Sequence, residues 1–334
     1  MIVTMAHGSG GAATSELIRD IFARSFDNDV LNEMEDSAVV PGSGRIAVTT
    51  DSFVVTPIEY PGGDIGRLCV CGTVNDLLMR GAVPKYLTCG FILQEGADTE
   101  VLKRIVESMA ATAREAGVKV VAGDTKVIEG NGGMLINTAG VGFVPEGIEV
   151  SAKSLKPGDV LILSGDLGDH HAAILGSRLS ISNDIVSDNA PLTEMVGNLQ
   201  ADKVNVHTMR DVTRGGLATV LKELAASSGV VIALEEDKIP VKQSVKDFCG
   251  LLGLDPLYMG NEGKMIAAVP RAEAEKALSA IRRAAYGEKA VVIGEVYDPA
   301  SAPAGKAGDL LLTTPIGGIR QLDVLQGEGL PRIC

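Results

Sequence analysis

Four aspartates in similar surroundings are the residues of this sequence whose types and placement most clearly suggest chemistry. Each lies at an apolar run beside Gly, Thr or Asn: Asp51 in TTDSF, Asp76 in TVNDLL, Asp124 in AGDTK and Asp211 in RDVTRGG. A single carboxylate in such a place is usually a turn former or a helix cap. Four that converged would repel one another, and a hard cation such as Mg²⁺, which prefers oxygen ligands, relieves that repulsion. We therefore expect a magnesium site, and bound Mg²⁺ can in turn hold a phosphate.

The glycine-rich segment HGSGG near the start of the sequence could bind that phosphate. Its backbone N–H groups could surround an anion, and the alternative is an ordinary frayed terminus. The candidate residues are His7, Gly8, Gly10 and Gly11.

Two further residues could take part in the chemistry. Lys126 follows Asp124 by two positions and could neutralise a transferred phosphate, although alone it would be a surface lysine. Glu262 lies in NEGK between two apolar runs. It could act as a general base if burial brings its pKa near neutrality, and otherwise it is a turn carboxylate.

Common nucleotide-binding motifs are missing from the sequence. The string NEGKM has Met265 where a phosphate-binding loop requires a hydroxyl, and no G-x-G-x-x-G follows an expected strand. We therefore expect neither a P-loop protein nor a simple dinucleotide-binding protein.

Cys334 is the last residue of the sequence, in the segment DVLQGEGLPRIC. It could be an accidental exposed thiol, but it does not fit a prenylation signal, which places the cysteine four residues from the end. The other cysteines are Cys69, Cys71, Cys89 and Cys249. The odd count disfavours a disulfide framework. If their segment is extended, Cys69 and Cys71 share one face, and we expect both to be core residues.

Composition narrows the class of protein. The chain has 334 residues, of which 46% are hydrophobic and 3% aromatic, which is enough for two domains with cores of aliphatic side chains. The net charge of −13 argues against binding to nucleic acid or to anionic membrane surfaces. We see neither a signal peptide nor a run of about 20 apolar residues, and we expect a cytoplasmic protein.

Periodicity predicts mixed helices and strands in both halves. Apolar stripes predict helices over 14–26, 98–117, 215–229 and 271–287, and 65–82 is expected to pass from a short helix or turn into a helix ending near Gly81. Strands are expected over 45–55 (interrupted at Asp51), 86–93, 118–127, 134–144, 155–165, 230–237 and 289–298, and periodicity fades beyond about Ile319. We predict an α/β (α+β) protein with an N-terminal segment 1–35, domains 36–150 and 151–320, and a flexible tail 321–334.

Taken together, the motifs resemble the HypE family of hydrogenase maturation factors. The matching strings are HGSGG, TDSFVVTP, GTVNDLLMRGA, AGDTKV, SGDLGDH, MRDVTRGGL, GNEGKM and the final PRIC, in order through nearly all of the chain. PRIC is the most specific, because aminoimidazole ribonucleotide synthetase, thiamine-monophosphate kinase and selenophosphate synthetase share the aspartate segments without this cysteine.

The resemblance implies a PurM-like synthetase fold with a C-terminal α/β sandwich. N-terminal domains of two subunits would pair into a β-barrel, giving a homodimer, and ATP would bind in a cleft between the domains. The implied nucleotide ligands are the HGSGG segment with Asn75, Asp76 and Asp124. The implied Mg²⁺ ligands are Asp51, Asp76 and Asp124, with Asp211 as a fourth.

The resemblance also implies a reaction on Cys334. A carbamoyltransferase, HypF, would load a carbamoyl group onto its sulfur, and ATP-dependent dehydration would convert the thiocarbamate to a thiocyanate. The cyanide would then pass to iron on a HypC–HypD scaffold for [NiFe] hydrogenase. Lys126 and Glu262 match positions proposed for catalysis, and residues 323–334 could reach roughly 40 Å when extended.

Two other functions compete with this interpretation. One is an ATP-dependent synthetase or kinase of the same superfamily that acts on a free metabolite and does not need Cys334. The other is a redox or metal-carrier protein that uses Cys334 with Cys69 and Cys71, a function for which the four acidic turns have no use.

Overall fold

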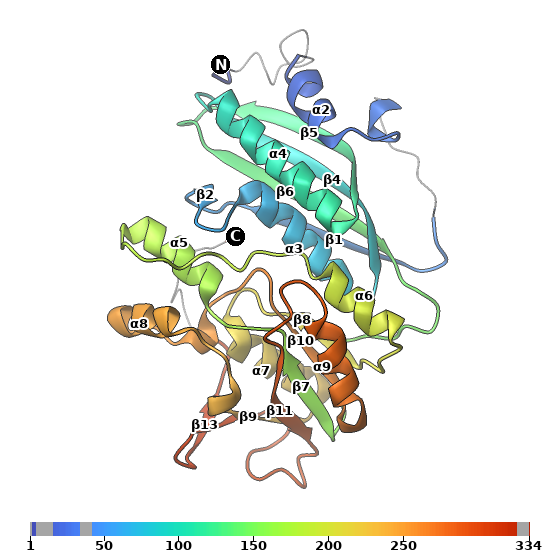
Figure 1. Cartoon of the computed structure of the whole chain (residues 1–334), viewed down its shortest axis with the longest axis vertical. Coiled ribbons are helices and arrows are strands. Elements are labelled where there is room, and N and C mark those ends of the chain that lie inside the picture. The colour runs from blue at the N-terminus through green and yellow to red at the C-terminus, as the bar shows by residue number, and fades with distance from the viewer. Residues whose placement is uncertain (1, 5–15, 34–41, 326–333) are drawn as a thin grey trace.

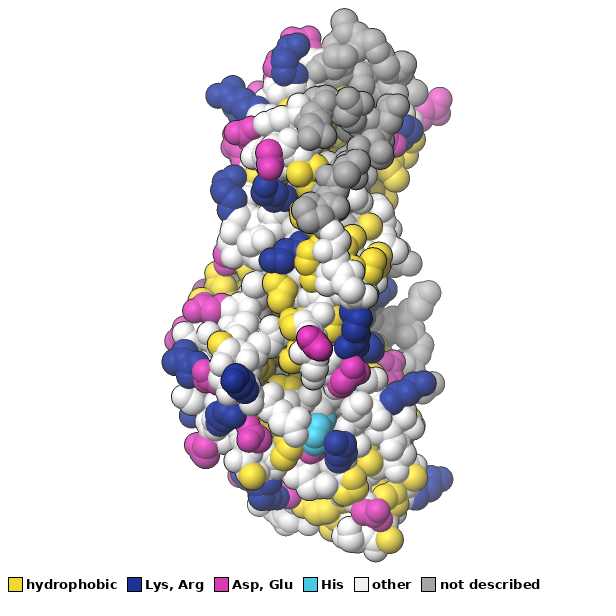
Figure 2. Space-filling view, turned by 90° about the vertical axis from the view of Figure 1, so that its right-hand side faces the viewer, with side chains coloured by type: hydrophobic (Ala, Val, Ile, Leu, Met, Phe, Trp, Pro, Cys, Tyr) yellow, Lys and Arg dark blue, Asp and Glu magenta, His cyan; other side chains and the backbone are white. Residues whose placement is uncertain are grey.

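The computed structural model describes residues 2–4, 16–33, 42–325 and 334 (Figure 1). Two large β-sheets, each built by one half of the chain, lie one above the other along the long axis in Figure 1. On the side that Figure 2 shows, hydrophobic side chains lie around the middle of the molecule and again near its lower end, with charged side chains interspersed along its length.

The N-terminal half holds a four-stranded sheet in the order β1-β6-β4-β5, in which only β4 and β5 run parallel. Its strands are β1 (Ile46–Phe53), β4 (Val83–Gln94), β5 (Lys119–Ile128) and β6 (Met134–Phe143). Its helices are α3 (Ile65–Met79) and α4 (Thr99–Ala116). A hairpin of β2 (Glu59–Tyr60) and β3 (Gly63–Asp64) precedes α3, and short helical turns cover Ile18–Ala23, α2 (Arg24–Phe26) and Leu31–Glu33.

Helix α4 shows why these residues fold as they do. The Asp98 carboxylate accepts a hydrogen bond from the N–H of Glu100, which caps the first turn. Gly117 ends the helix at φ 72°, a left-handed conformation that glycine adopts without steric cost. The apolar stripe between the two caps is fully buried, as predicted: Leu102, Ile105, Val106 and Met109.

Helices α3 and α4 cover one face of this sheet, and apolar side chains are exposed on the other. Cys89 of β4 shows the covered side, since its thiol contacts the Met109 sulfur of α4. Four apolar side chains of the strands remain between 38% and 65% exposed: Ile46, Val48, Ile92 and Ile128. A sheet face this apolar is typical of a surface that another protein covers.

The C-terminal half holds a seven-stranded sheet in the order β13-β12-β9-β11-β7-β10-β8, antiparallel except between β9 and β12. The strands are β7 (Asp159–Leu163), β8 (Thr208–Asp211), β9 (Val231–Glu235), β10 (Met265–Pro270), β11 (Val291–Tyr297), β12 (Leu310–Thr313) and β13 (Ile319–Leu322). The helices are α5 (Asp169–Leu179), α6 (Thr193–Ala201), α7 (Gly216–Ser228), α8 (Gln243–Leu252) and α9 (Ala274–Arg282), with 3₁₀ turns at Glu236–Lys238, Pro256–Tyr258 and Arg271–Glu273.

One hydrophobic core joins the two halves. Strand β7 is buried on both faces: Leu161 and Leu163 belong to the cluster that includes α7, while Val160 and Ile162 belong to a larger cluster. That larger cluster contains side chains of α3 and α4 together with α6 and α9. The apolar contact between the halves therefore fixes the position of any site between them.

The structure corrects several predictions of local structure. Strand β1 runs through Asp51 without a break, residues 65–79 form one continuous helix, and Ile319–Leu322 form strand β13. Helices α6 and α8 lie outside the predicted helices. Cys69 and Cys71 lie on a helix and not on an extended segment, but both are fully buried, which confirms them as core residues.

Three predictions about chain organisation have different outcomes. The two-sheet α/β architecture confirms the predicted fold class. The predicted domain boundaries stay predictions, and the start of the helix expected from residue 14 lies outside the described residues. Among the helices that the structure describes, none is long and apolar enough to span a bilayer.

Candidate active site

A cavity of about 380 Å³ lies where the two halves meet. The N-terminal half contributes Asp51 of β1 and Asp76 of α3 to its wall, and the C-terminal half contributes Asp211 at the end of β8 and Glu262. Cys334 also lines this cavity. We call it the carboxylate cavity.

Strand pairing and helix packing position these carboxylates. The Thr49 hydroxyl of β1 donates a hydrogen bond of 2.8 Å to the Asp76 carboxylate of α3, which holds Asp76 beside the strand that carries Asp51. Asp211 pairs with Met265 where β8 ends and β10 begins, and Glu262 lies in the loop that enters β10. Within the described residues, none of the four cavity carboxylates forms an ion pair.

Burial and mutual repulsion change the acidity of these groups. Burial, and then the charge of Asp76, raise the pKa of Asp51 and of Asp211 to about 6, while nearby arginines oppose the shift. Glu262 is almost fully buried, and burial, followed by the charges of Asp211 and other carboxylates, raises its pKa well above its usual value. Acids with unfavourable charge in this state are stabilised by a bound cation.

The oxygen ligands and their unfavourable charges fit Mg²⁺. In the part of the chain that the structure describes, no three His, Cys, Asp or Glu side chains are placed to hold a metal by themselves. Magnesium commonly binds through one or two carboxylates and completes its coordination with water and phosphate oxygens. Asp51, Asp76 and Asp211 can provide those carboxylates.

Cys334 lies at the wall of the carboxylate cavity and is not fully exposed. It is half-buried, packs against the larger hydrophobic cluster and lines the carboxylate cavity. The Tyr258 hydroxyl donates to the carbonyl oxygen of Asp323 (3.0 Å), and the N–H of Leu325 donates to the Thr219 hydroxyl (3.1 Å). The chain is therefore attached to the C-terminal half just before residue 326.

Asp124 and Lys126 do not join the other candidate residues within the chain. Asp124 pairs with Gly90 and Lys126 with Ile92, so both side chains lie on the sheet face away from the helices, whereas Asp51 lies on the helix-covered face. The Lys126 ammonium donates to the Asp124 carboxylate at 2.8 Å, and both side chains are about two-thirds exposed.

Asn75 has a structural role in addition to its predicted one. Its side-chain amide donates to the carbonyl oxygen of Ala190 and accepts from the N–H of Leu192, and so ties α3 to the C-terminal half. Contact with a nucleotide stays a prediction for Asn75. His7, Gly8, Gly10 and Gly11 lie outside the described residues.

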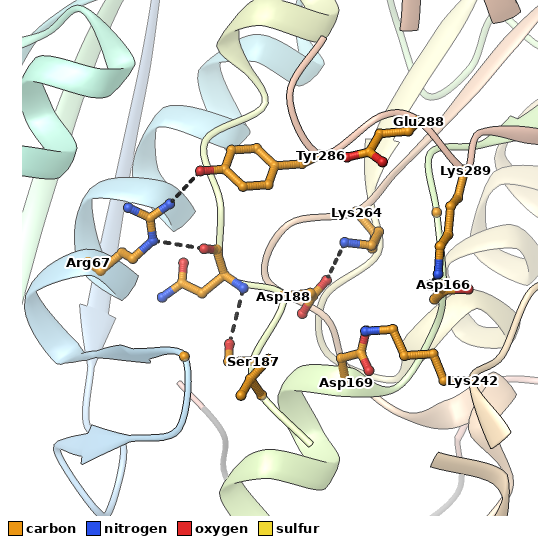
Figure 3. A pocket seen from close by; sticks show the side chains of 14 residues that line it. Arg67, Asp166, Asp169, Ser187, Asp188, Lys242, Lys264, Tyr286, Glu288 and Lys289 are labelled. Atoms are coloured by element: carbon orange, nitrogen blue, oxygen red, sulfur yellow. Dashed lines mark hydrogen bonds and ion pairs between the residues drawn. The ribbon is translucent and has the colours of Figure 1, made fainter. Parts of the chain in front are cut away.

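A second cavity, of about 500 Å³, has paired charges (Figure 3). In this cavity Lys264 pairs with Asp188 at 3.1 Å, Lys242 with Asp169 at 2.8 Å, and Lys289 with Asp166 at 2.6 Å. Because the opposite charges within each ion pair compensate one another, this cavity lacks the uncompensated negative charge of the carboxylate cavity.

Asp188 connects the two cavities. Its carboxylate accepts hydrogen bonds from the N–H groups of Glu262 and Gly263 and pairs with Lys264. The loop that presents Glu262 is thereby anchored to a buried ion pair on its other side.

Sequence reasoning missed the basic residues of the carboxylate cavity. Arg80, Arg210 and Arg214 also line it. The signal for Arg214 was available in TRGG, because a charged residue directly before two glycines is presented on a tight turn.

Comparison with known proteins defines the class first. Residues 34–144 match the model of the AIR synthase related protein N-terminal domain, and residues 156–302 match that of the C-terminal domain. A thiamine-monophosphate kinase from Stenotrophomonas maltophilia, 19% identical with a TM-score of 0.67, shares the fold. The chain is thus a two-domain protein of the AIR synthase-related, PurM-like class.

Closer relatives specify the family. The chain is 48% identical to carbamoyl dehydratase HypE of Azotobacter vinelandii, covering 99% of this chain and 97% of the relative, and 45% identical to that of Escherichia coli K12, covering 99% of both. It superposes with a TM-score of 0.95 on a hydrogenase maturation protein HypE crystallised with ATP, at 46% identity and 99% coverage of both chains. A HypE–HypF complex gives a TM-score of 0.79, also at 46% identity, covering 92% of this chain and 99% of that one. The chain belongs to the HypE family of carbamoyl dehydratases.

Proposed function

We propose that this protein dehydrates an S-carbamoyl group on its own Cys334 to a thiocyanate, which supplies cyanide for the active-site iron of [NiFe] hydrogenase. The observation that carries the proposal is that Cys334 lines the same cavity as Asp51, Asp76, Asp211 and Glu262. The family membership agrees with it.

The cavity residues divide the chemistry between them. An amide oxygen is a poor leaving group, and bound ATP supplies the phosphoryl group that makes it a good one. Asp51, Asp76 and Asp211 would hold Mg²⁺, which neutralises charge on the phosphates. Glu262, whose pKa is raised by burial, would accept an N–H proton as phosphate departs.

ATP binding rests on the relative of known structure that holds this nucleotide. We expect the nucleotide to lie between the two halves, with its phosphates at the carboxylate cavity. The HGSGG segment, Asn75 and Asp124 are the other predicted nucleotide contacts.

Homodimer formation would explain both the open sheet face and the position of Lys126. A second copy that covers Ile46, Val48 and Ile92 would remove exposed apolar surface from water, as in a barrel closed by two sheets. Lys126 lies on the same face, so its ammonium would serve the partner subunit's cavity.

A mixing experiment tests this arrangement. Lys126→Ala and Cys334→Ala protomers should each be inactive alone. If Lys126 acts across the dimer, the mixed dimer regains dehydration, because one cavity then holds both Cys334 and the partner's lysine. A mixed dimer without activity would place Lys126 in its own chain's reaction.

HypF is the proposed carbamoyl donor, since a related HypE has been crystallised in a complex with HypF. We propose that the HypC–HypD iron scaffold accepts the cyanide and that the reactions occur in the cytoplasm.

Intact-mass spectrometry tests the proposed function. After HypF loads the carbamoyl group, ATP should lower the mass of the chain by one water. Cys334→Ala should show neither the carbamoyl gain nor the water loss, whereas Cys249→Ala, which removes a buried thiol elsewhere, should show both. Unchanged ATP turnover on a free metabolite by Cys334→Ala would instead favour the alternative synthetase or kinase.

A further inference from the structure

Arg214 lines the carboxylate cavity with a guanidinium that no described side chain pairs with. Arg210 lines the same cavity but lies 3.7 Å from Glu223, its partner in an exposed ion pair. In contrast, the side chain of Arg214 forms no hydrogen bond or ion pair with any residue in the described ranges. It lines the cavity together with Asp51 and Glu262, and its positive charge partly opposes the rise that burial causes in the pKa of these two acids.

The backbone around Arg214 is tightly constrained. Gly215 and Gly216 follow it at φ 77° and 66°, and a Cβ on Gly216 would approach the carbonyl oxygen of Leu257 to 2.5 Å. Only glycine therefore fits the turn that presents Arg214.

The segment that carries Arg214 is also attached to the loop that carries Glu262. The N–H of Val212 donates to the carbonyl oxygen of Lys264 (2.9 Å), and the carbonyl oxygen of Val212 accepts from both the backbone and the side-chain N–H groups of Asn261. Arg214, Asp211 and Glu262 are thus held as one unit beside Cys334.

The chemistry proposed for Cys334 needs a cation at this place. The carbamoyl oxygen forms a bond to phosphorus as the bond from phosphorus to ADP breaks. The C–O bond then breaks, both N–H protons leave, and a C≡N bond and phosphate result. Negative charge on the phosphoryl oxygens meets four carboxylates, and the chain's own Lys126 lies on the other face of the sheet, so within one chain the cation must come from the cavity wall. A guanidinium can bind two phosphoryl oxygens at once.

We propose that Arg214 is a further catalytic residue, which contacts the phosphoryl group during its transfer to the carbamoyl oxygen on Cys334. This proposal rests on the function proposed above. In this proposal the TRGG turn holds the positive charge of Arg214 in a fixed position opposite the Mg²⁺ ligands.

The test compares Arg214→Gln with Arg271→Gln, which removes an exposed arginine charge that pairs with Glu295 outside the cavity. Single-turnover dehydration of carbamoylated Arg214→Gln should slow by about 10²-fold or more, as when a catalytic arginine is removed from a phosphoryl-transfer site. Binding of ADP–aluminium fluoride, which mimics the transferred group, should weaken at least about tenfold, while ADP affinity stays within about threefold. Arg271→Gln should resemble wild type in both measurements.

Three outcomes separate the possibilities. Dehydration by Arg214→Gln within about threefold of wild type, or unchanged binding of ADP–aluminium fluoride, overturns the role of Arg214. If that variant does not fold, Arg214→Lys decides by the same measurements, since it keeps the charge but loses the planar fork. Absence of water loss from the carbamoylated wild-type chain would instead overturn the proposed function.

Discussion

Replacing Asp211 by Asn should stabilise the protein when nucleotide and metal are absent. Asp211 is 7% exposed, and its carboxylate is placed near Asp51, Asp76 and Glu262 without an ion-pair partner among the described residues. An amide has nearly the same shape as a carboxylate but carries no charge. The substitution therefore removes a repulsion that the folded state has and the unfolded state lacks.

The pKa shift sets the size of this effect. The pKa of Asp211 rises from 3.8 to about 6 on folding. At about 1.4 kcal/mol per pKa unit, that shift corresponds to roughly 3 kcal/mol of destabilisation when the group is ionised. Because part of the repulsion is shared with Asp76, we expect the free energy of unfolding of Asp211→Asn to exceed that of wild type by about 2 kcal/mol at pH 8.

The direction of the pH dependence follows from the raised pKa. Between pH 4 and 6, folded Asp211 binds a proton that the unfolded chain does not bind, so the wild type gains stability as the pH falls through this window. Above about pH 6 Asp211 is ionised in the folded protein, and its full destabilisation of the folded state is present. The advantage of Asp211→Asn should therefore be greatest above pH 6 and should disappear toward pH 4.

Urea denaturation with a metal chelator present measures the difference. Asp237→Asn, at an exposed aspartate of a 3₁₀ turn, is the control and should change stability by less than about 0.5 kcal/mol. When Mg²⁺ and ATP are added, wild type should become more stable than Asp211→Asn, because wild type binds this ligand and the variant binds it poorly. A lower stability of Asp211→Asn at pH 8 would refute the electrostatic description of the cavity.

Two other predictions concern the position of Cys334 and the contact between the halves. Thr213→Cys places a second thiol in the cavity wall and should form a disulfide with Cys334 under mild oxidation. Leu251→Cys, at an exposed position of α8, is the control and should form no such disulfide. Equal disulfide yields from the two variants would show that Cys334 does not lie at the cavity. Arg67→Ala removes the half-buried ion pair with Glu115 and the contact with Tyr286. It should lower the free energy of unfolding by about 1 kcal/mol, measured by thermal or urea denaturation. An unchanged free energy of unfolding would show that this contact does not hold the halves together.

Local patterns were sufficient to predict the well-formed elements. Helices α4 and α7 each combine an apolar stripe with a terminal glycine in the left-handed conformation, Gly117 and Gly229. The motif around Asp51, Asp76 and Asp211 also predicted residues that the fold brings together. In these cases a few neighbouring residues are enough to predict the element or the site residue.

Sequence could not tell which face of a sheet a side chain occupies. Asp51 and Asp124 look alike as strand residues, but partner strands place the first toward α3 and the second on the open face. A shift of one residue in register reverses the face, and register depends on distant strands. For the same reason, the contact of Asn75 with Ala190 depends on packing between the two halves.

The fate of the carbamoyl oxygen tests the central claim most directly, namely that Cys334 carries a carbamoyl group whose oxygen leaves as phosphate. Cys334 would be loaded with carbamoyl containing a heavy oxygen isotope, and ATP added for a single turnover. We predict that the label appears in inorganic phosphate, one labelled oxygen for each thiocyanate formed. Label released as water, with unlabelled phosphate, would contradict the account.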